Sequence, residues 1–194
     1  MANFYDIRPL EEAELPRFES FPFGSMDTHK RRFGMQVSGK LVFLVAWQMD
    51  RPVGQVLLNW VGGDGSGVPP QVREWPEVSS LFVTPAYRRK GIASQMLDMA
   101  EQMTYAHGHN HVGLCVAEAN RSAQILYARR GYRDIGWPPY LARGFFTNEK
   151  GQRCTWEESR GFLLKQLGVG EWDLDYSVET GPLAPNQNSN RERS

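Results

Sequence analysis

Three consecutive cations, Arg88, Arg89 and Lys90, stand directly before Gly91 and are the residues best suited to carry chemistry. They follow an apolar run over residues 78–83 and precede a helical pattern, so the chain turns there from a strand into a helix. A helix N-terminus leaves backbone N–H groups without acceptors and carries a partial positive charge. A glycine lets a ligand approach that backbone closely. The pattern therefore predicts a phosphate-binding loop.

A second block, from Asn120 to Tyr132, reads N-R-S-A-Q-I-L-Y-A-R-R-G-Y. With the earlier R-x-x-G-x-A over residues 88–93, it resembles the two hallmarks of the GNAT superfamily, the acetyl-CoA-dependent N-acetyltransferases. The second hallmark is N-x-x-A-x-x-L-Y-x-x-x-G-[FY], and every fixed position is matched here. A strand-like run over residues 111–117 separates the two blocks.

The resemblance implies a fold and a site for acetyl-CoA, the co-substrate. The fold is an α/β GNAT acyltransferase fold, whose mixed central sheet has about six to seven strands, flanking helices and a splayed parallel strand pair. The pyrophosphate would lie on the loop backbone, and the pantetheine arm along the strand before it. The residues implied in coenzyme binding are Leu81, Phe82, Val83, Arg88, Arg89, Lys90, Gly91, Ile92, Ala93, Ser94, Asn120, Ala123 and Tyr127. An N-cap is the alternative role for Asn120.

The resemblance also implies two catalytic residues. Tyr127 stands where the superfamily has a tyrosine that acts as general acid on the departing thiolate; its alternative is packing against Ala123, one helical turn earlier. Glu77 matches the position of the general base in several branches, and a solvated strand start is its alternative. Glu74, Glu118 and a water relay remain further candidates for deprotonating the amine.

The implied reaction is transfer of an acetyl group from acetyl-CoA to an amine, by direct attack in a ternary complex and without a metal. The alternative is a catalytically silent GNAT-fold module that binds acyl-CoA as a regulatory ligand. The acceptor would be a small-molecule or peptide amine, and the sequence does not narrow it further.

The composition favours a cytoplasmic globular protein. Of 194 residues, 41% are apolar, and 22 basic residues balance 22 acidic ones, so nucleic acid is not the expected partner. No apolar run reaches the roughly 18 residues that span a bilayer, and the N-terminus lacks a signal-peptide pattern. Cys115 and Cys154 form no metal-binding or disulfide pattern, and Cys115 is expected to be a buried, inert thiol. His107, His109 and His111 alternate, but a turn between them should scatter their side chains.

Hydrophobic periodicity predicts strands over residues 4–8, 41–49, 53–61, 77–83, 111–117 and 161–167, one strand beginning at Tyr132, and helices over 11–18, 26–37, 92–107 and 121–130. Residues 62–67 are expected to be a flexible connection, because they lack the G-K-[ST] ending of a Walker motif. Residues 137–160 are expected to be irregular, and either to shape an acceptor pocket or to cover the sheet edge. Residues 1–172 should form a single domain and residues 173–194 a mobile polar tail.

Overall fold

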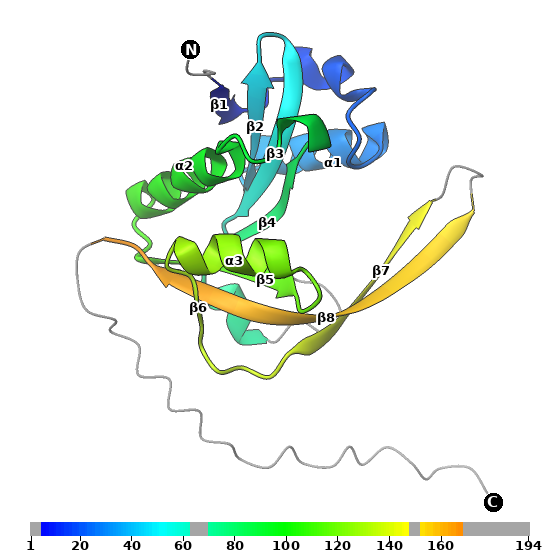
Figure 1. Cartoon of the computed structure of the whole chain (residues 1–194). Coiled ribbons are helices and arrows are strands. Elements are labelled where there is room, and N and C mark those ends of the chain that lie inside the picture. Colours follow the sequence, from blue (N-terminus) through cyan, green and yellow to red (C-terminus); the bar gives the residue numbers. More distant parts are fainter. Residues whose placement is uncertain (1–4, 63–69, 148–151, 169–194) are drawn as a thin grey trace, which may run out of the picture.

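The computed structural model describes residues 5–62, 70–147 and 152–168 (Figure 1). Its elements are, in chain order, β1 (Asp6–Pro9), the 3-10 helix η1 (Glu12–Phe18), α1 (Met26–Val37), β2 (Leu41–Gln48), β3 (Arg51–Asn59), η2 (Pro70–Glu74), β4 (Glu77–Val83), η3 (Pro85–Tyr87), α2 (Ile92–Ala106), β5 (His111–Ala117), α3 (Arg121–Arg129), β6 (Arg133–Asp134), β7 (Tyr140–Thr147) and β8 (Arg153–Gln166). The expected tail, and all but the first residue of the expected connection at 62–67, lie outside the described residues.

The strands form one mixed sheet of eight strands in the order β1-β2-β3-β4-β5-β8-β6, with β7 paired to β8. All pairs are antiparallel except β4 and β5, which α2 connects. These two strands pair only at Glu77 with Gly113 and at Val78 with Leu114, and they then diverge. The predicted mixed α/β fold with a splayed parallel pair is thus confirmed.

A β-bulge interrupts β4 immediately before its last residues. Gln55 of β3 pairs with Phe82, but Leu57 pairs with Ser79, so Val56 faces two residues of β4. One of them, Ser80, has a φ of 54°, which is unusual for a residue with a side chain. A bulge bends its strand and redirects its side chains, so β4 changes course at Ser80.

Helices cover both faces of the sheet (Figure 1). Helices α2 and α3 pack on one face, where Met96, Leu97 and Ala100 of α2 are fully buried against the sheet. Gly54 of β3 permits this approach, because a Cβ atom there would stand 3.0 Å from Met96 Cε. The other face carries α1 and η1 over a second cluster that includes Phe18, Phe43 and Trp47.

The helix ends lie where the local sequence predicts them. The Ser25 side chain accepts a hydrogen bond from the Thr28 N–H and caps the start of α1. Gly108 and Gly131 follow the C-termini of α2 and α3 with φ values of 88° and 85°, the left-handed conformation that ends a helix. None of the helices in the described part of the chain is long and apolar enough to span a membrane.

The predicted irregular connection at residues 137–160 is wrong for most of its length. A long hairpin arm, formed by β7 and the first half of β8, occupies it and extends away from the rest of the sheet (Figure 1). The last strand consequently begins at Arg153 and not at Gly161, and the strand predicted from Tyr132 is the two-residue β6. The arm escaped prediction because a two-stranded ribbon outside the core needs no regular apolar alternation.

A buried ionic cluster, the Glu101 network, ties α2 to the end of α3 and to β8. The Glu101 carboxylate accepts hydrogen bonds from Arg130 at 3.0 Å, from Lys165 at 2.6 Å and from the Tyr132 hydroxyl at 3.2 Å. Arg130 also pairs with the more exposed Asp98. Breaking a buried pair leaves an uncompensated charge, so the loss of one member of this network would destabilise the contact of α2 with the end of α3 and with β8.

Candidate functional site

The loop from Arg88 to Gly91 has the backbone expected of a phosphate site. Arg89 and Gly91 both have positive φ, at 60° and 80°, so the chain turns sharply before α2. The α2 hydrogen bonds begin where the Gln95 N–H donates to the Gly91 carbonyl, at 3.0 Å. The N–H groups of Ile92 and Ala93 therefore lie in the first turn, which leaves donors free for an anion.

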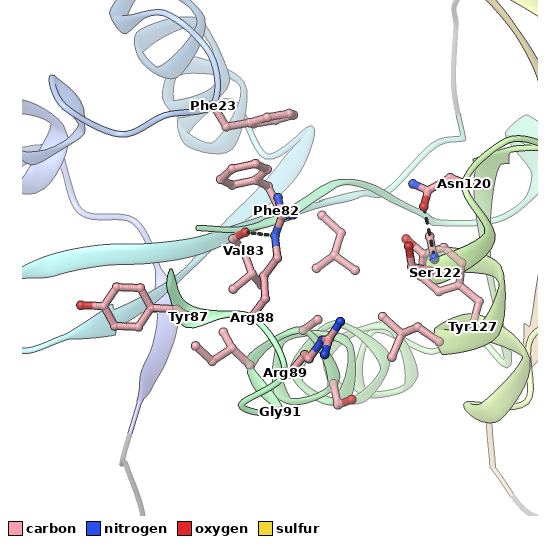
Figure 2. A pocket seen from close by; sticks show the side chains of 16 residues that line it. Phe23, Phe82, Val83, Tyr87, Arg88, Arg89, Gly91, Asn120, Ser122 and Tyr127 are labelled. Atoms are coloured by element: carbon pink, nitrogen blue, oxygen red, sulfur yellow. Dashed lines mark hydrogen bonds between the residues drawn. The ribbon is translucent and has the colours of Figure 1, made fainter. Parts of the chain in front are cut away.

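A cavity of about 720 Å³ lies between this loop, β4 and α3 (Figure 2). It brings together twelve of the thirteen predicted coenzyme-binding residues, which come from three separate parts of the chain. They are Leu81, Phe82, Val83, Arg88, Arg89, Gly91, Ile92, Ala93, Ser94, Asn120, Ala123 and Tyr127. Lys90 does not line the cavity; its ammonium lies 5.1 Å from the centre of the Tyr87 ring. The two sequence blocks therefore meet on one cavity.

Strand β4 forms the floor of the cavity with its last residues. Because β4 pairs with β5 only through Glu77 and Val78, the residues that follow have no strand partner on the β5 side. The Arg88 side chain folds back along this end and donates from Nε to the Val83 carbonyl at 3.0 Å. Backbone groups of an unpaired strand edge are able to pair with an extended ligand.

Tyr127 faces the cavity from α3 and is only 7% exposed. Burial raises the pKa of the Tyr127 phenol to about 12, so the hydroxyl keeps its proton throughout the physiological range. The ring packs at 61° against Tyr132, with 5.8 Å between the ring centres. Ala123, one turn earlier, also lines the cavity. The side chain is thus both a packing residue and a protonated donor at the cavity wall.

Asn120 caps a helix and also stands at the cavity. Its Oδ1 accepts a hydrogen bond from the Ala123 N–H at 3.2 Å, which makes it the N-cap of α3. The exposed side chain also lines the cavity opposite Arg89 (Figure 2).

Glu77 lies away from the cavity, on the opposite face of the sheet. Along β4 and β5, Val78 and Leu114 face α2 and α3, so Glu77 and Cys115 point to the other side. There Cys115 lies beside Glu77 and Tyr140, and both of them act on the pKa of its thiol. Burial, with the charge of Glu77, raises the pKa of Cys115 to about 12, so the thiol stays protonated. Glu77 itself is only 7% exposed, so it is not a solvated strand start.

Four residues that line the cavity were not predicted: Phe23, Tyr87, Ser122 and Leu126. Ser122 and Leu126 belong to the second sequence block, and Tyr87 adjoins the first, so proximity to the motifs would have found them. Phe23 lies far away in the sequence and carries no such signal. Its ring stacks on Phe82, with 4.7 Å between centres.

The three alternating histidines do not form a metal site within the described residues. His107 stacks on the Trp60 ring at 4.0 Å, whereas His111 is buried in β5 beside Asn110. The described part of the chain holds no group of three or more His, Cys, Asp or Glu side chains that would bind a metal ion.

Comparison with known proteins agrees with this arrangement. The sequence matches the acetyltransferase (GNAT) family over residues 4–132, which is more than half of the chain. Similar solved structures include the ribosomal-protein-S18-alanine N-acetyltransferase from Escherichia coli, with 17% identity, a TM-score of 0.57, and coverage of 88% of this chain and 99% of that one. PaiA N-acetyltransferase from Thermoplasma acidophilum, in complex with coenzyme A, has 14% identity, a TM-score of 0.56, and coverage of 84% and 99%.

A further similar structure is a putative acetyltransferase from Salmonella typhimurium with its cofactor acetyl-CoA. It has 17% identity and a TM-score of 0.58, and the alignment covers 87% of this chain and 96% of that one. At such identities these structures support the fold, whereas the family match extends across both sequence blocks and the cavity between them. This chain belongs to the GNAT acetyltransferase family.

Proposed function

We propose that this protein transfers the acetyl group of acetyl-CoA to an amine acceptor by direct attack in a ternary complex. The observation that carries the proposal is the cavity, which joins the loop before α2, the unpaired end of β4 and the inner face of α3. These three features offer donors for phosphates, a strand edge for an extended arm and a protonated phenol. Similar structures that contain coenzyme A and acetyl-CoA support the same ligand.

The residues present fit acetyl-CoA. The first turn of α2 and the cations Arg88 and Arg89 would hold the phosphates, because they combine free N–H groups with full positive charges at one end of the cavity. The end of β4, from Leu81 to Val83, would hold the pantetheine arm through backbone hydrogen bonds. The bound thioester supplies the acetyl group, and its place would be the end of the cavity farther from α2, near Leu81.

Tyr127 would donate a proton, or a hydrogen bond, to the sulfur as the thiol departs. The pKa of the phenol, about 12, is about 3.5 units above that of a thiol at ~8.5, so full proton transfer to a free thiolate is uphill by roughly 5 kcal/mol. The donation must therefore accompany the breaking of the carbon–sulfur bond. The buried position of Tyr127 fixes its hydroxyl at the cavity wall, which such a concerted role requires.

Glu77 would accept the proton of the acceptor amine from the opposite face of the sheet. Its carboxylate lies beside Cys115 and Tyr140, whose pKa values it raises. Because Glu77 is outside the cavity, it would act through a water molecule and not by direct contact with the amine.

The direct experiment measures release of free coenzyme A thiol from acetyl-CoA in the presence of a broad panel of amines. Calorimetry with coenzyme A, performed on the same protein, reports binding independently of turnover. Binding with acceptor-dependent thiol release is the expected result. Tight binding without release for any amine would favour the catalytically silent acyl-CoA-binding module, and no binding would overturn both functions.

A further inference from the structure

Arg32 of α1 is a partly buried cation that has no ion-pair partner among the residues that the structure describes. Its Nη2 donates to the Ser80 side-chain oxygen at 3.1 Å. Its Nη1 is buried and has no hydrogen-bond partner among the residues that the structure describes. Burial, together with the nearby charge of Arg31, lowers the pKa of Arg32 to about 10, so the group is still a cation at neutral pH. A buried charge without a partner is costly, and a bound anion would remove that cost.

The surroundings of Arg32 supply no such anion within the described residues. Gln55 is fully buried, donates from Nε2 to the Ser80 carbonyl at 3.4 Å and has an Oε1 without a hydrogen-bond partner. His29, one helical turn before Arg32, is fully buried, and its pKa of about 4 keeps it neutral. Arg32 Nη1 and Gln55 Oε1 are therefore a buried donor and a buried acceptor without hydrogen-bond partners, in two side chains that both bond to Ser80.

This polar group adjoins the acetyl end of the proposed coenzyme site. Ser80 is the bulged residue of β4 and directly precedes Leu81, which lines the cavity. The Arg32 guanidinium lies 5.7 Å from the centre of the Phe23 ring, and Phe23 lines the cavity as well, stacked on Phe82 (Figure 2). A molecule at this end of the cavity therefore meets an aromatic pair with a guanidinium next to it.

We propose that the acceptor is an amine that also carries a carboxylate, such as an amino acid or the end of a short peptide, and that Arg32 binds this carboxylate. The inference rests on the proposed transferase function. A guanidinium matches the two oxygens of a carboxylate with two donors, and it is the side chain most suited to that pairing. The N–H of the same acceptor offers a donor for Gln55 Oε1. Its apolar part would lie on Phe23 and Phe82.

The test compares N-acetyl amino acids, the expected products, with their C-terminal amides, which differ only in the carboxylate. Calorimetry would measure the binding of N-acetyl derivatives of glycine, methionine, phenylalanine and glutamate, and of the matching amides, to protein saturated with coenzyme A. At least one acid should bind at least tenfold more tightly than its amide. In Arg32→Gln this preference should disappear, while the affinity for the amide changes less than twofold.

Arg31→Gln is the matched control, because it removes the same charge from the exposed neighbouring position. It should leave the preference for the acid intact. The inference is overturned if no acid binds better than its amide, or if Arg31→Gln and Arg32→Gln reduce the preference equally. If the same protein preparation then releases coenzyme A thiol with amines that lack a carboxylate, the transferase function stands and only the proposed class of acceptor is wrong.

Discussion

Replacing Gly91 by alanine separates the role of the phosphate loop from the stability of the fold. Gly91 has a φ of 80°, and alanine in the left-handed conformation costs about 1–2 kcal/mol. The added methyl group would meet only the Gln95 side-chain nitrogen at 3.6 Å, which is ordinary contact. Gly131 is a matched control, with a φ of 85° and no heavy atom within 4 Å of the added carbon. Both variants should therefore lose the same 1–2 kcal/mol of unfolding free energy.

Their effects on coenzyme binding should differ. The methyl group at position 91 would stand at the first turn of α2, beside N–H groups that are proposed to contact phosphate. Loss of one hydrogen bond to a charged group costs about 1.5–3 kcal/mol, which corresponds to a roughly ten- to hundredfold increase in the dissociation constant of coenzyme A. Gly131 ends α3 and does not line the cavity, so Gly131→Ala should bind coenzyme A as the parent does.

The assay pairs urea denaturation with calorimetric titration of coenzyme A at 25 °C, on the parent, Gly91→Ala, Gly131→Ala and Gly91→Glu. The glutamate variant adds repulsion between its carboxylate and the phosphates and should bind most weakly. Equal stability of the two alanine variants together with equal affinity for coenzyme A would refute the phosphate-loop assignment. A much larger loss of unfolding free energy in Gly91→Ala than in Gly131→Ala would instead refute the argument that the left-handed backbone conformation alone determines this loss.

Four further outcomes are expected. Tyr127→Phe should lower turnover by roughly 10²-fold with unchanged coenzyme affinity, and a loss below about tenfold would mean that the hydroxyl donates only a hydrogen bond. Glu77→Gln should lower turnover at neutral pH and regain part of it at alkaline pH, so a pH–rate profile superimposable on the parent would exclude Glu77 as base. Glu101→Gln should cost about 2–4 kcal/mol in urea denaturation, against less than about 1 kcal/mol for Asp98→Asn, whose side chain is 52% exposed. As the pH falls from 6.5 to 4.5, the parent should lose about 2–3 kcal/mol more unfolding free energy than His29→Phe. In this range His29 binds a proton in the unfolded chain but not in the folded protein, where burial lowers its pKa to about 4.

The predictable parts of the fold and of the site are those that depend on residues close together in the sequence. Gly91 and Gly131 mark left-handed turns at helix ends, and the three cations before α2 mark the loop proposed to bind phosphate, because each signal depends on residues a few positions apart. The expected β4 and β5 also have the bounds that their apolar runs predict. The position of Tyr127 in the cavity followed from the resemblance of its block to a known family, and not from periodicity.

The remaining parts depend on contacts between distant residues. Arg32 reaches Ser80 across 48 positions of the sequence, and neither residue lies in a recognisable motif. The bulge at Ser80 arises from the pairing of β3 with β4, which no local pattern encodes. The position of Glu77 was predicted, but its neighbour Tyr140 begins β7, in a stretch for which no strand was expected. Such contacts are decided by topology and not by local propensity.

The divergence of β4 from β5 also determines which molecules are able to pair with this sheet. An unpaired strand edge at the rim of a sheet invites edge-to-edge association with another folded chain. Here the unpaired edges lie in the middle of the sheet, because β4 is paired with β3 on its other side and β5 with β8. The edge of a second folded sheet is too bulky to enter between them. Only a single extended thread has a sufficiently small cross-section, so the same opening would admit the proposed coenzyme arm and would disfavour aggregation through these edges.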